Sequence, residues 1–189
     1  MAIRLIAGLG NPGPKYDQTR HNAGFWFVEE LAARYQGRFG HETKFSGDVA
    51  KILVDNQAVW LLKPTTFMNR SGIALRQLMS FYKIGIDELL VAHDELDLEP
   101  GTCKLKKAGG HGGHNGLRDI FNHVGKDFWR LRIGIGHPGH RDQVIDYVLN
   151  PPRREEEGLI RQSIDDAAAL APLIIAGEFE RAMHQLHSR

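Results

Sequence analysis

Short apolar runs along the chain alternate with stretches in which apolar residues recur at helical spacing. A run of roughly four to eight apolar residues with turn-forming flanks predicts a buried strand, while apolar positions three and four residues apart predict an amphipathic helix. We predict strands over residues 3–9, 49–54, 58–62, 89–93, 102–106 (an edge strand) and 131–136, and helices over 25–35, 69–82, 117–124, 141–149, 155–176 and 178–187. This alternation is typical of an α/β fold: a single domain over residues 1–189, with a mixed twisted β-sheet flanked by helices.

Composition and charge describe an ordinary globular chain: of its 189 residues, 42% are hydrophobic and 25% are charged, and the net charge is +1. No apolar run approaches the roughly 20 residues that span a bilayer, and the segment Met1–Leu5 lacks the layout of a signal peptide. The single cysteine, Cys103, allows no internal disulfide and fits a reducing compartment. We therefore expect a cytoplasmic protein without a membrane anchor, in which a local basic patch would hold any nucleic-acid partner.

The segment Gly109–Gly116 concentrates glycines, histidines and an asparagine just before a predicted helix. Glycines let another molecule approach the backbone closely, and the N–H groups at a helix start favour anions. This combination predicts a functional loop, with a mobile linker as the plainer alternative. The three-residue spacing in the pairs His111/His114 and His137/His140 also suggests a metal site as an alternative. Against it, the motif H-E-x-x-H is absent, and one cysteine cannot build a cysteine-rich zinc site.

The segment Gly8–Gly13 matches the glycine spacing of a dinucleotide-binding turn after a strand. The surrounding sequence does not fit a dinucleotide-binding turn. In that turn a helix begins directly after the glycines, whereas here Pro12 and Pro14 delay the helix. What remains is a turn at a strand end that presents Asn11, the usual place for a ligand in an open α/β sheet.

A histidine and a carboxylate are candidates for acid–base chemistry. His21 lies just before the first helix, where it is either a general base or a surface histidine with Asn22 as the helix N-cap. Asp94 follows a buried strand, and a carboxylate there could accept a hydrogen bond from a histidine ring, fixing its tautomer and stabilising the imidazolium. The plainer interpretation is a group of acids that cap a loop.

Amide, aromatic and basic side chains supply candidate binding groups. Asn69 and Asn115 are either helix N-caps or ligand contacts, and Phe67 belongs either to the core or to a binding rim. Ser71 has no G-x-S-x-G elbow around it and is no credible nucleophile. Basic residues on neighbouring strands form either a solvated face or phosphate contacts: Lys104, Lys106, Lys107, Arg130 and Arg132.

Read together and in order, six segments resemble the motifs of the bacterial peptidyl-tRNA hydrolase family. They cover most of the chain up to about residue 150: Gly8–Gly13, Tyr16 with Thr19–Gly24, Lys63–Asn69, Ala92–Asp97, Gly109–Gly116 and Arg130–Gly136. The resemblance implies an α/β domain, active as a monomer without metal or cofactor, that cleaves the ester between a peptide and the 3′ end of tRNA.

The same resemblance implies roles for individual residues. It implies that His21 is the general base that activates water, that Asp94 orients it, and that Asn11 helps to distinguish an N-blocked peptidyl group from a free aminoacyl group. It also implies substrate or tRNA contacts for Tyr16, Phe67, Asn69, His114, Asn115, Lys106 and Arg132. Two rival functions remain open at this point: a non-catalytic RNA-binding domain and a nucleotide-binding oxidoreductase.

Overall fold

A computed structural model describes residues 2–188, so Met1 and Arg189, the two ends of the predicted domain, lie outside the described residues. The central sheet has seven strands in the order β2-β3-β4-β1-β5-β7-β6. Their bounds are β1 Leu5–Gly8, β2 Gly40–Glu42, β3 Gly47–Val54, β4 Gln57–Pro64, β5 Leu89–Glu95, β6 Cys103–Lys107 and β7 Trp129–Gly134. The four neighbouring strands β4, β1, β5 and β7 are parallel, and β2, β3 and β6 run antiparallel to their neighbours. The predicted α/β class and mixed sheet are confirmed.

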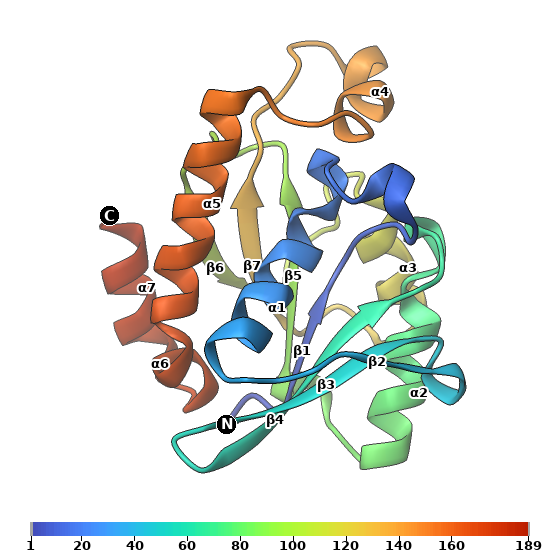
Figure 1. Ribbon diagram of the computed structural model, residues 1–189, viewed down its shortest axis with the longest axis vertical. Helices are drawn as coiled ribbons and strands as arrows, with labels where there is room; N and C mark the ends of the chain where they lie inside the picture. Colours follow the sequence, from blue (N-terminus) through green and yellow to red (C-terminus); the bar gives the residue numbers. More distant parts are fainter. Residues whose placement is uncertain (1, 189) are drawn as a thin grey trace.

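Helices cover both faces of this sheet (Figure 1). Their bounds are α1 Ala23–Arg34, α2 Gly72–Tyr82, α3 Asn115–Val124, α4 Val144–Val148, α5 Arg154–Ala169, α6 Ala171–Ile175 and α7 Phe179–His187. One apolar cluster packs α1, α5, α6 and α7 against the sheet, and a second cluster packs α2 and α3 against the opposite face. Throughout residues 2–188, no helix combines the length and the apolar character needed to cross a membrane.

The sequence pattern missed one strand and merged two helices. Strand β2 is only three exposed residues long, so it carries no apolar periodicity. The helix predicted over 155–176 is instead interrupted at Leu170, between α5 and α6. The reason is Pro172 in the first turn of α6, which lacks an N–H group and whose ring would clash with the carbonyl four residues earlier in a continuous helix.

The start of α1 lies unusually close to the sheet. A Cβ atom on Gly8 would collide with the carbonyl oxygen of Gly24, and one on Gly24 would collide with the carbonyl oxygen of Ala92. These glycines therefore allow the segment before α1 to approach the ends of β1 and β5, which are hydrogen-bonded neighbours. Because parallel strands end at one edge of the sheet, residues that follow β1 and β5 meet there, at the point where the strand order reverses.

Candidate active site

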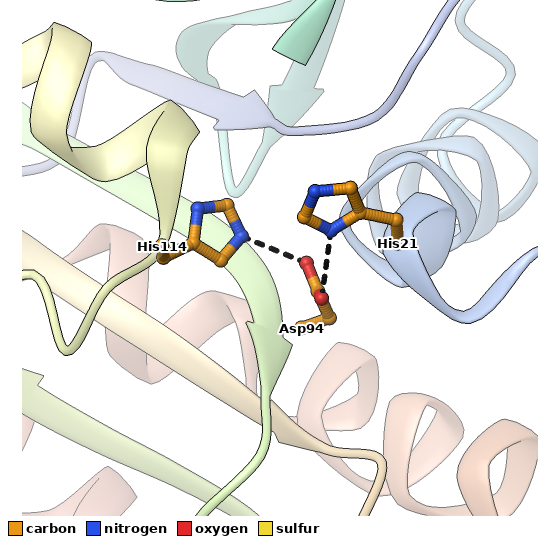
Figure 2. Close-up of side chains that lie close together, drawn as sticks. All are labelled: His21, Asp94 and His114. Carbon is orange, nitrogen blue, oxygen red and sulfur yellow. Dashed lines mark hydrogen bonds and ion pairs between the residues drawn. The ribbon is translucent and has the colours of Figure 1, made fainter. Parts of the chain in front are cut away.

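Three side chains meet at this carboxyl edge of the sheet (Figure 2). Asp94 lies near the end of β5, His21 lies in a 3-10 turn that leads into α1, and His114 immediately precedes α3. Because α1 and α3 pack on opposite faces of the sheet, the two imidazoles reach the carboxylate from opposite sides. The fold thus brings together residues that are far apart in the sequence.

Both histidines are hydrogen-bonded to Asp94. Nδ1 of His21 lies 2.8 Å from Oδ2 of Asp94, and Nε2 of His114 lies 2.8 Å from Oδ1. Nδ1 of His114 accepts the backbone N–H of Leu117 at 3.3 Å, so the proton of this ring is on Nε2 and is donated to the carboxylate. His21 likewise donates through Nδ1, and its Nε2 is turned away from the carboxylate with a free lone pair (Figure 2).

The electrostatics of this triad keep Asp94 ionised and stabilise a positive charge on His21 when its ring takes up a proton. Burial opposes ionisation of Asp94, which is 4% exposed, but interactions with His21 and His114 outweigh it and hold the pKa of the carboxyl far below its ordinary value. Burial also disfavours the imidazolium of His21, yet the charge of Asp94 and its hydrogen bond raise the pKa of His21 above the ordinary value. The carboxylate therefore stays ionised and stabilises the protonated ring.

His93 is a third histidine beside the triad, but it cannot exchange protons with a ligand. It is 2% exposed, its Nδ1 lies 2.9 Å from the backbone oxygen of Asp94, and its ring packs edge-on against His114 at 5.3 Å between centroids. Burial, reinforced by the neighbouring His114, lowers the pKa of His93 to about 4. It is therefore a neutral packing residue of the site.

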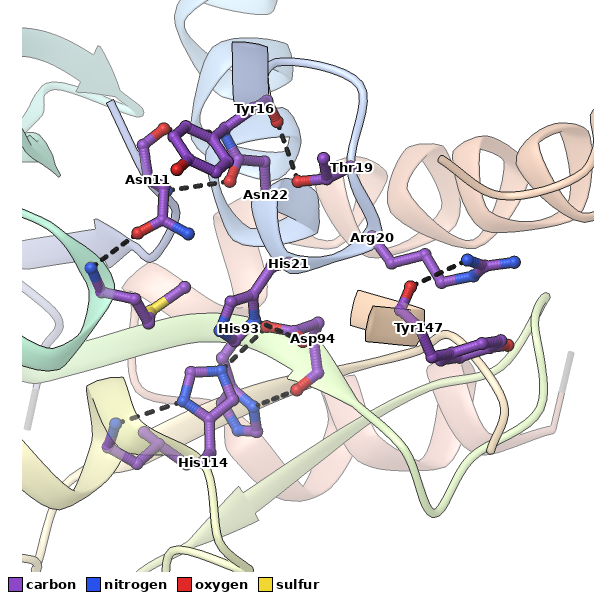
Figure 3. A network of polar contacts seen from close by, with 12 residues as sticks. Asn11, Tyr16, Thr19, Arg20, His21, Asn22, His93, Asp94, His114 and Tyr147 are labelled. Atoms are coloured by element: carbon purple, nitrogen blue, oxygen red, sulfur yellow. Dashed lines mark hydrogen bonds and ion pairs between the residues drawn. The ribbon is translucent and has the colours of Figure 1, made fainter. Parts of the chain in front are cut away.

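Asn11 lies in the segment that follows β1, across the site from Asp94 (Figure 3). Its side-chain oxygen accepts the backbone N–H of Met68 at 2.7 Å. Asn22 holds the Asn11 backbone from both sides: Oδ1 accepts the N–H of Asn11 at 2.8 Å, and Nδ2 donates to its carbonyl oxygen at 3.0 Å. Asn22 is the N-cap residue of α1 by position, as expected, but its side chain makes no cap hydrogen bond to the helix and binds Asn11 instead.

The remaining binding candidates line the same edge. Phe67 is 59% exposed and its ring meets that of Tyr16 edge-on at 6.3 Å, so Phe67 is not a core residue. Asn69 is exposed in a 3-10 turn before α2, and Asn115 is the exposed first residue of α3. Neither amide is the N-cap of its helix: the cap residue of α2 is Ser71, and the cap of α3 is His114.

The basic residues of β6 and β7 differ in exposure. In the β6–β7 pair, Lys104 faces Arg132 and Lys106 faces Arg130, so all four lie on one face of the sheet. Lys106 is exposed, whereas Arg132 forms an ion pair with Glu95 at 2.9 Å. Arg130 is buried.

Arg130 supports the glycine-rich loop Gly109–Gly116 through hydrogen bonds to its backbone. Its guanidinium donates to the backbone oxygens of Gly109, Gly110 and Lys126 at 2.8–3.0 Å. These bonds hold the start of the loop and use three of the five N–H groups of the buried guanidinium. Arg130 is therefore a structural anchor of the loop.

Arg20 is a residue of the site that sequence reasoning missed. It is buried, donates to the backbone oxygens of Tyr147 and Asn150 at 2.9 and 3.2 Å, and stacks on the Tyr147 ring at 3.8 Å (Figure 3). Its neighbour in the chain is His21, so Arg20 fastens the turn that carries this histidine to the segment around α4. Nothing in the sequence distinguishes it from a surface arginine.

The histidine pairs singled out by spacing do not form a metal site. Nδ1 of His111 accepts the N–H of Gly113, and Nδ1 of His140 accepts the N–H of Asp142. Both rings thus stabilise their own turns. A different group, made of His21, Asp94 and His114, has its potential ligand atoms within 4.8 Å of one another. Its ring nitrogens, however, donate to the carboxylate and do not present lone pairs there.

Comparison with known proteins shows the family of the chain. The family model "Peptidyl-tRNA hydrolase" matches residues 5–189. The chain is 56% identical over 190 residues to the peptidyl-tRNA hydrolase of Colwellia psychrerythraea, covering 100% of this chain and 98% of the relative, and 55% identical over 187 residues to that of Halorhodospira halophila, covering 98% and 96%. The crystal structure of the peptidyl-tRNA hydrolase from Acinetobacter baumannii superposes with a TM-score of 0.95 at 49% identity, covering 97% of this chain and 94% of that one. The resemblance of the six motifs is thereby confirmed, and the chain belongs to the peptidyl-tRNA hydrolase family of enzymes.

Proposed function

We propose that this chain hydrolyses the ester bond between the peptide and the 3′ end of tRNA in peptidyl-tRNA, releasing free tRNA and peptide. The observation that carries the proposal is the His21–Asp94 pair, in which Nδ1 is held by the carboxylate and Nε2 is left as a base. Membership of the peptidyl-tRNA hydrolase family gives the substrate class. This combination favours a hydrolase over a non-catalytic RNA-binding domain or an oxidoreductase.

The reaction follows from the protonation states. Nε2 of His21 takes a proton from water as the water oxygen attacks the ester carbonyl carbon, giving a tetrahedral intermediate. Asp94 stabilises the imidazolium that forms. The C–O bond to the ribose then breaks, and the imidazolium returns its proton to the leaving 3′ oxygen. The side-chain amide of Asn69 is the proposed donor to the oxyanion.

The peptidyl end would be held around Asn11. With Oδ1 occupied by the N–H of Met68, the amide nitrogen of Asn11 is left to donate to a carbonyl of an N-blocked substrate. Tyr16 and Phe67 offer aromatic surface beside it. Asn115 and His114, at the start of α3, complete the proposed substrate contacts.

The tRNA body would lie against β6 and β7. Lys106 is exposed there without a carboxylate partner among residues 2–188, and Arg132 lies on the same face. Cations in this arrangement suit phosphate contacts. We also propose that the chain acts as a monomer in the cytoplasm, which light scattering and cell fractionation would test.

Hydrolysis of N-acetyl-aminoacyl-tRNA by the wild type and the His21→Ala variant tests the proposal. Loss of the general base is expected to lower kcat by about 10²–10⁴-fold. His111→Ala is the matched control, because the ring of His111 caps its own turn and packs on Phe121 without contacting Asp94 or His21. Equal cleavage by wild type and His21→Ala would overturn the role of His21. A wild type that binds tRNA but cleaves nothing would favour the RNA-binding alternative.

A further inference from the structure

The triad also has the composition of a metal ligand set. Two imidazoles and one carboxylate are ligands that zinc accepts, and the potential ligand atoms of His21, Asp94 and His114 lie within 4.8 Å of one another. Within the described part of the chain, no other three histidine, cysteine or acidic side chains are close enough to do the same. The side chains of His21 and His114 are 13% and 9% exposed, so a small ion can reach them, while Asp94 provides a fixed buried charge.

A zinc ion at this place would have to reorganise the protons of both rings. Zinc bonds to lone pairs, whereas Nδ1 of His21 and Nε2 of His114 now carry protons donated to Asp94. Each neutral ring can free that nitrogen by carrying its proton on the other nitrogen, with no net release of protons. A protonated His21 would instead lose one proton to solvent.

The consequence at His21 is inhibition of the base. When Nδ1 binds the ion, the ring proton is on Nε2, the atom that must accept a proton from water. The consequence at His114 is a cost in affinity, because a proton on Nδ1 removes the acceptor of the Leu117 N–H at the start of α3. The two effects together define a site that takes zinc only by switching off the reaction.

We propose that His21, Asp94 and His114 form an inhibitory Zn²⁺ site in which the ion competes with the protons that the two histidines donate to Asp94. The inhibitory consequence rests on the proposed function, whereas the binding of the ion does not. The two are therefore tested by separate measurements.

Zinc binding to the full chain is measured first, by competition with a chromogenic chelator in metal-free buffer. The wild type is expected to bind one zinc ion at this site, and Asp94→Asn and His114→Ala are each expected to weaken that binding by roughly tenfold or more. The matched control is the double variant His137→Ala/His140→Ala, which removes two exposed histidines elsewhere and is expected to leave the affinity unchanged. Affinity that is retained in the triad variants, or lost in the control, would overturn the site.

A measurement on the wild type alone removes any dependence on variant folding. Histidine ¹⁵N NMR is expected to show zinc on Nδ1 of His21 and the proton on Nε2, and a spectrum with zinc on Nε2 would refute the proposed mode of binding.

Hydrolysis of N-acetyl-aminoacyl-tRNA is then expected to fall by half at the zinc concentration that half-fills the site, and to recover on chelation. If the protein does not hydrolyse this substrate with or without zinc, the proposed function fails while the binding result still stands, and activity that depends on zinc would overturn the inhibitory role. If activity is unaffected by a filled site, the inhibitory role is wrong.

Discussion

Nδ1 of His21 lies 2.8 Å from Oδ2 of Asp94, although the two residues are 73 positions apart in the sequence. The contact joins the turn before α1 to the end of β5. The other carboxylate oxygen of Asp94 is hydrogen-bonded to His114. A carboxylate that receives two N–H groups stays ionised, and it fixes the tautomer of the ring that must act as the base.

Asp94→Asn tests this relationship. The amide can present its N–H to Nδ1 of His21, which favours the tautomer with its proton on Nε2, and it no longer stabilises an imidazolium. We expect kcat for N-acetyl-aminoacyl-tRNA to fall by about 10²–10⁴-fold, with a much smaller change in the affinity for substrate. Single-turnover kinetics and equilibrium binding separate the two effects. A loss confined to binding would contradict the orienting role.

The pH dependence of kcat/KM tests the state of His21. The base must be neutral, so activity rises with pH through the pKa of His21 and is lost below it. Because Asp94 raises that pKa, the acidic limb is expected above the value of about 6.5 typical of a free histidine. In the residual activity of Asp94→Asn the limb is expected to move to lower pH. An identical limb in both proteins would show that another group controls it.

The fold was largely predictable because its elements have clear periodicity. The apolar runs at β1, β4 and β5 are buried strands, and the helical spacing of α1 and α2 is real. The misses have local causes. Strand β2 is short and exposed, and Pro172 interrupts a helix whose apolar pattern continues across the break.

Some contacts of the site were predictable and others were not. Motif resemblance predicted that Asp94 orients His21, and the two side chains are hydrogen-bonded. The contact of Asn22 with Asn11 could not be read from spacing, because Asn11 follows a different secondary-structure element. The sequence left open whether Arg130 contacts phosphate or lies on a solvated face. Only the fold shows that its guanidinium donates hydrogen bonds to backbone carbonyl oxygens. Contacts between distant segments depend on the order of the strands in the sheet, and that order cannot be read from the pattern of a single sequence.

Asn22→Ala tests the support of Asn11. Asn22 is 1% exposed, and its removal leaves the N–H and carbonyl groups of Asn11 without their partners. We expect the free energy of unfolding to fall by about 1–3 kcal/mol, and activity measured well below the melting temperature to fall as well, because the Asn11 side chain is no longer fixed. The control is Asn122→Ala, an exposed residue of α3, which should change neither. A loss of stability without any loss of activity would limit Asn22 to a structural role.

Lys106→Ala tests the proposed path of the tRNA over β6 and β7. A lysine that contacts a phosphate releases a counterion on binding, so its removal is expected to lower the slope of log affinity against log salt by about 1 and to weaken binding similarly for different tRNAs. Titrations of deacylated tRNA at several salt concentrations measure the slope. Lys51→Ala is the matched control, because Lys51 is also exposed but lies on β3, toward the opposite edge of the sheet. Equal slopes in the wild type and Lys106→Ala, or an equal drop in both variants, would place the tRNA elsewhere on the protein.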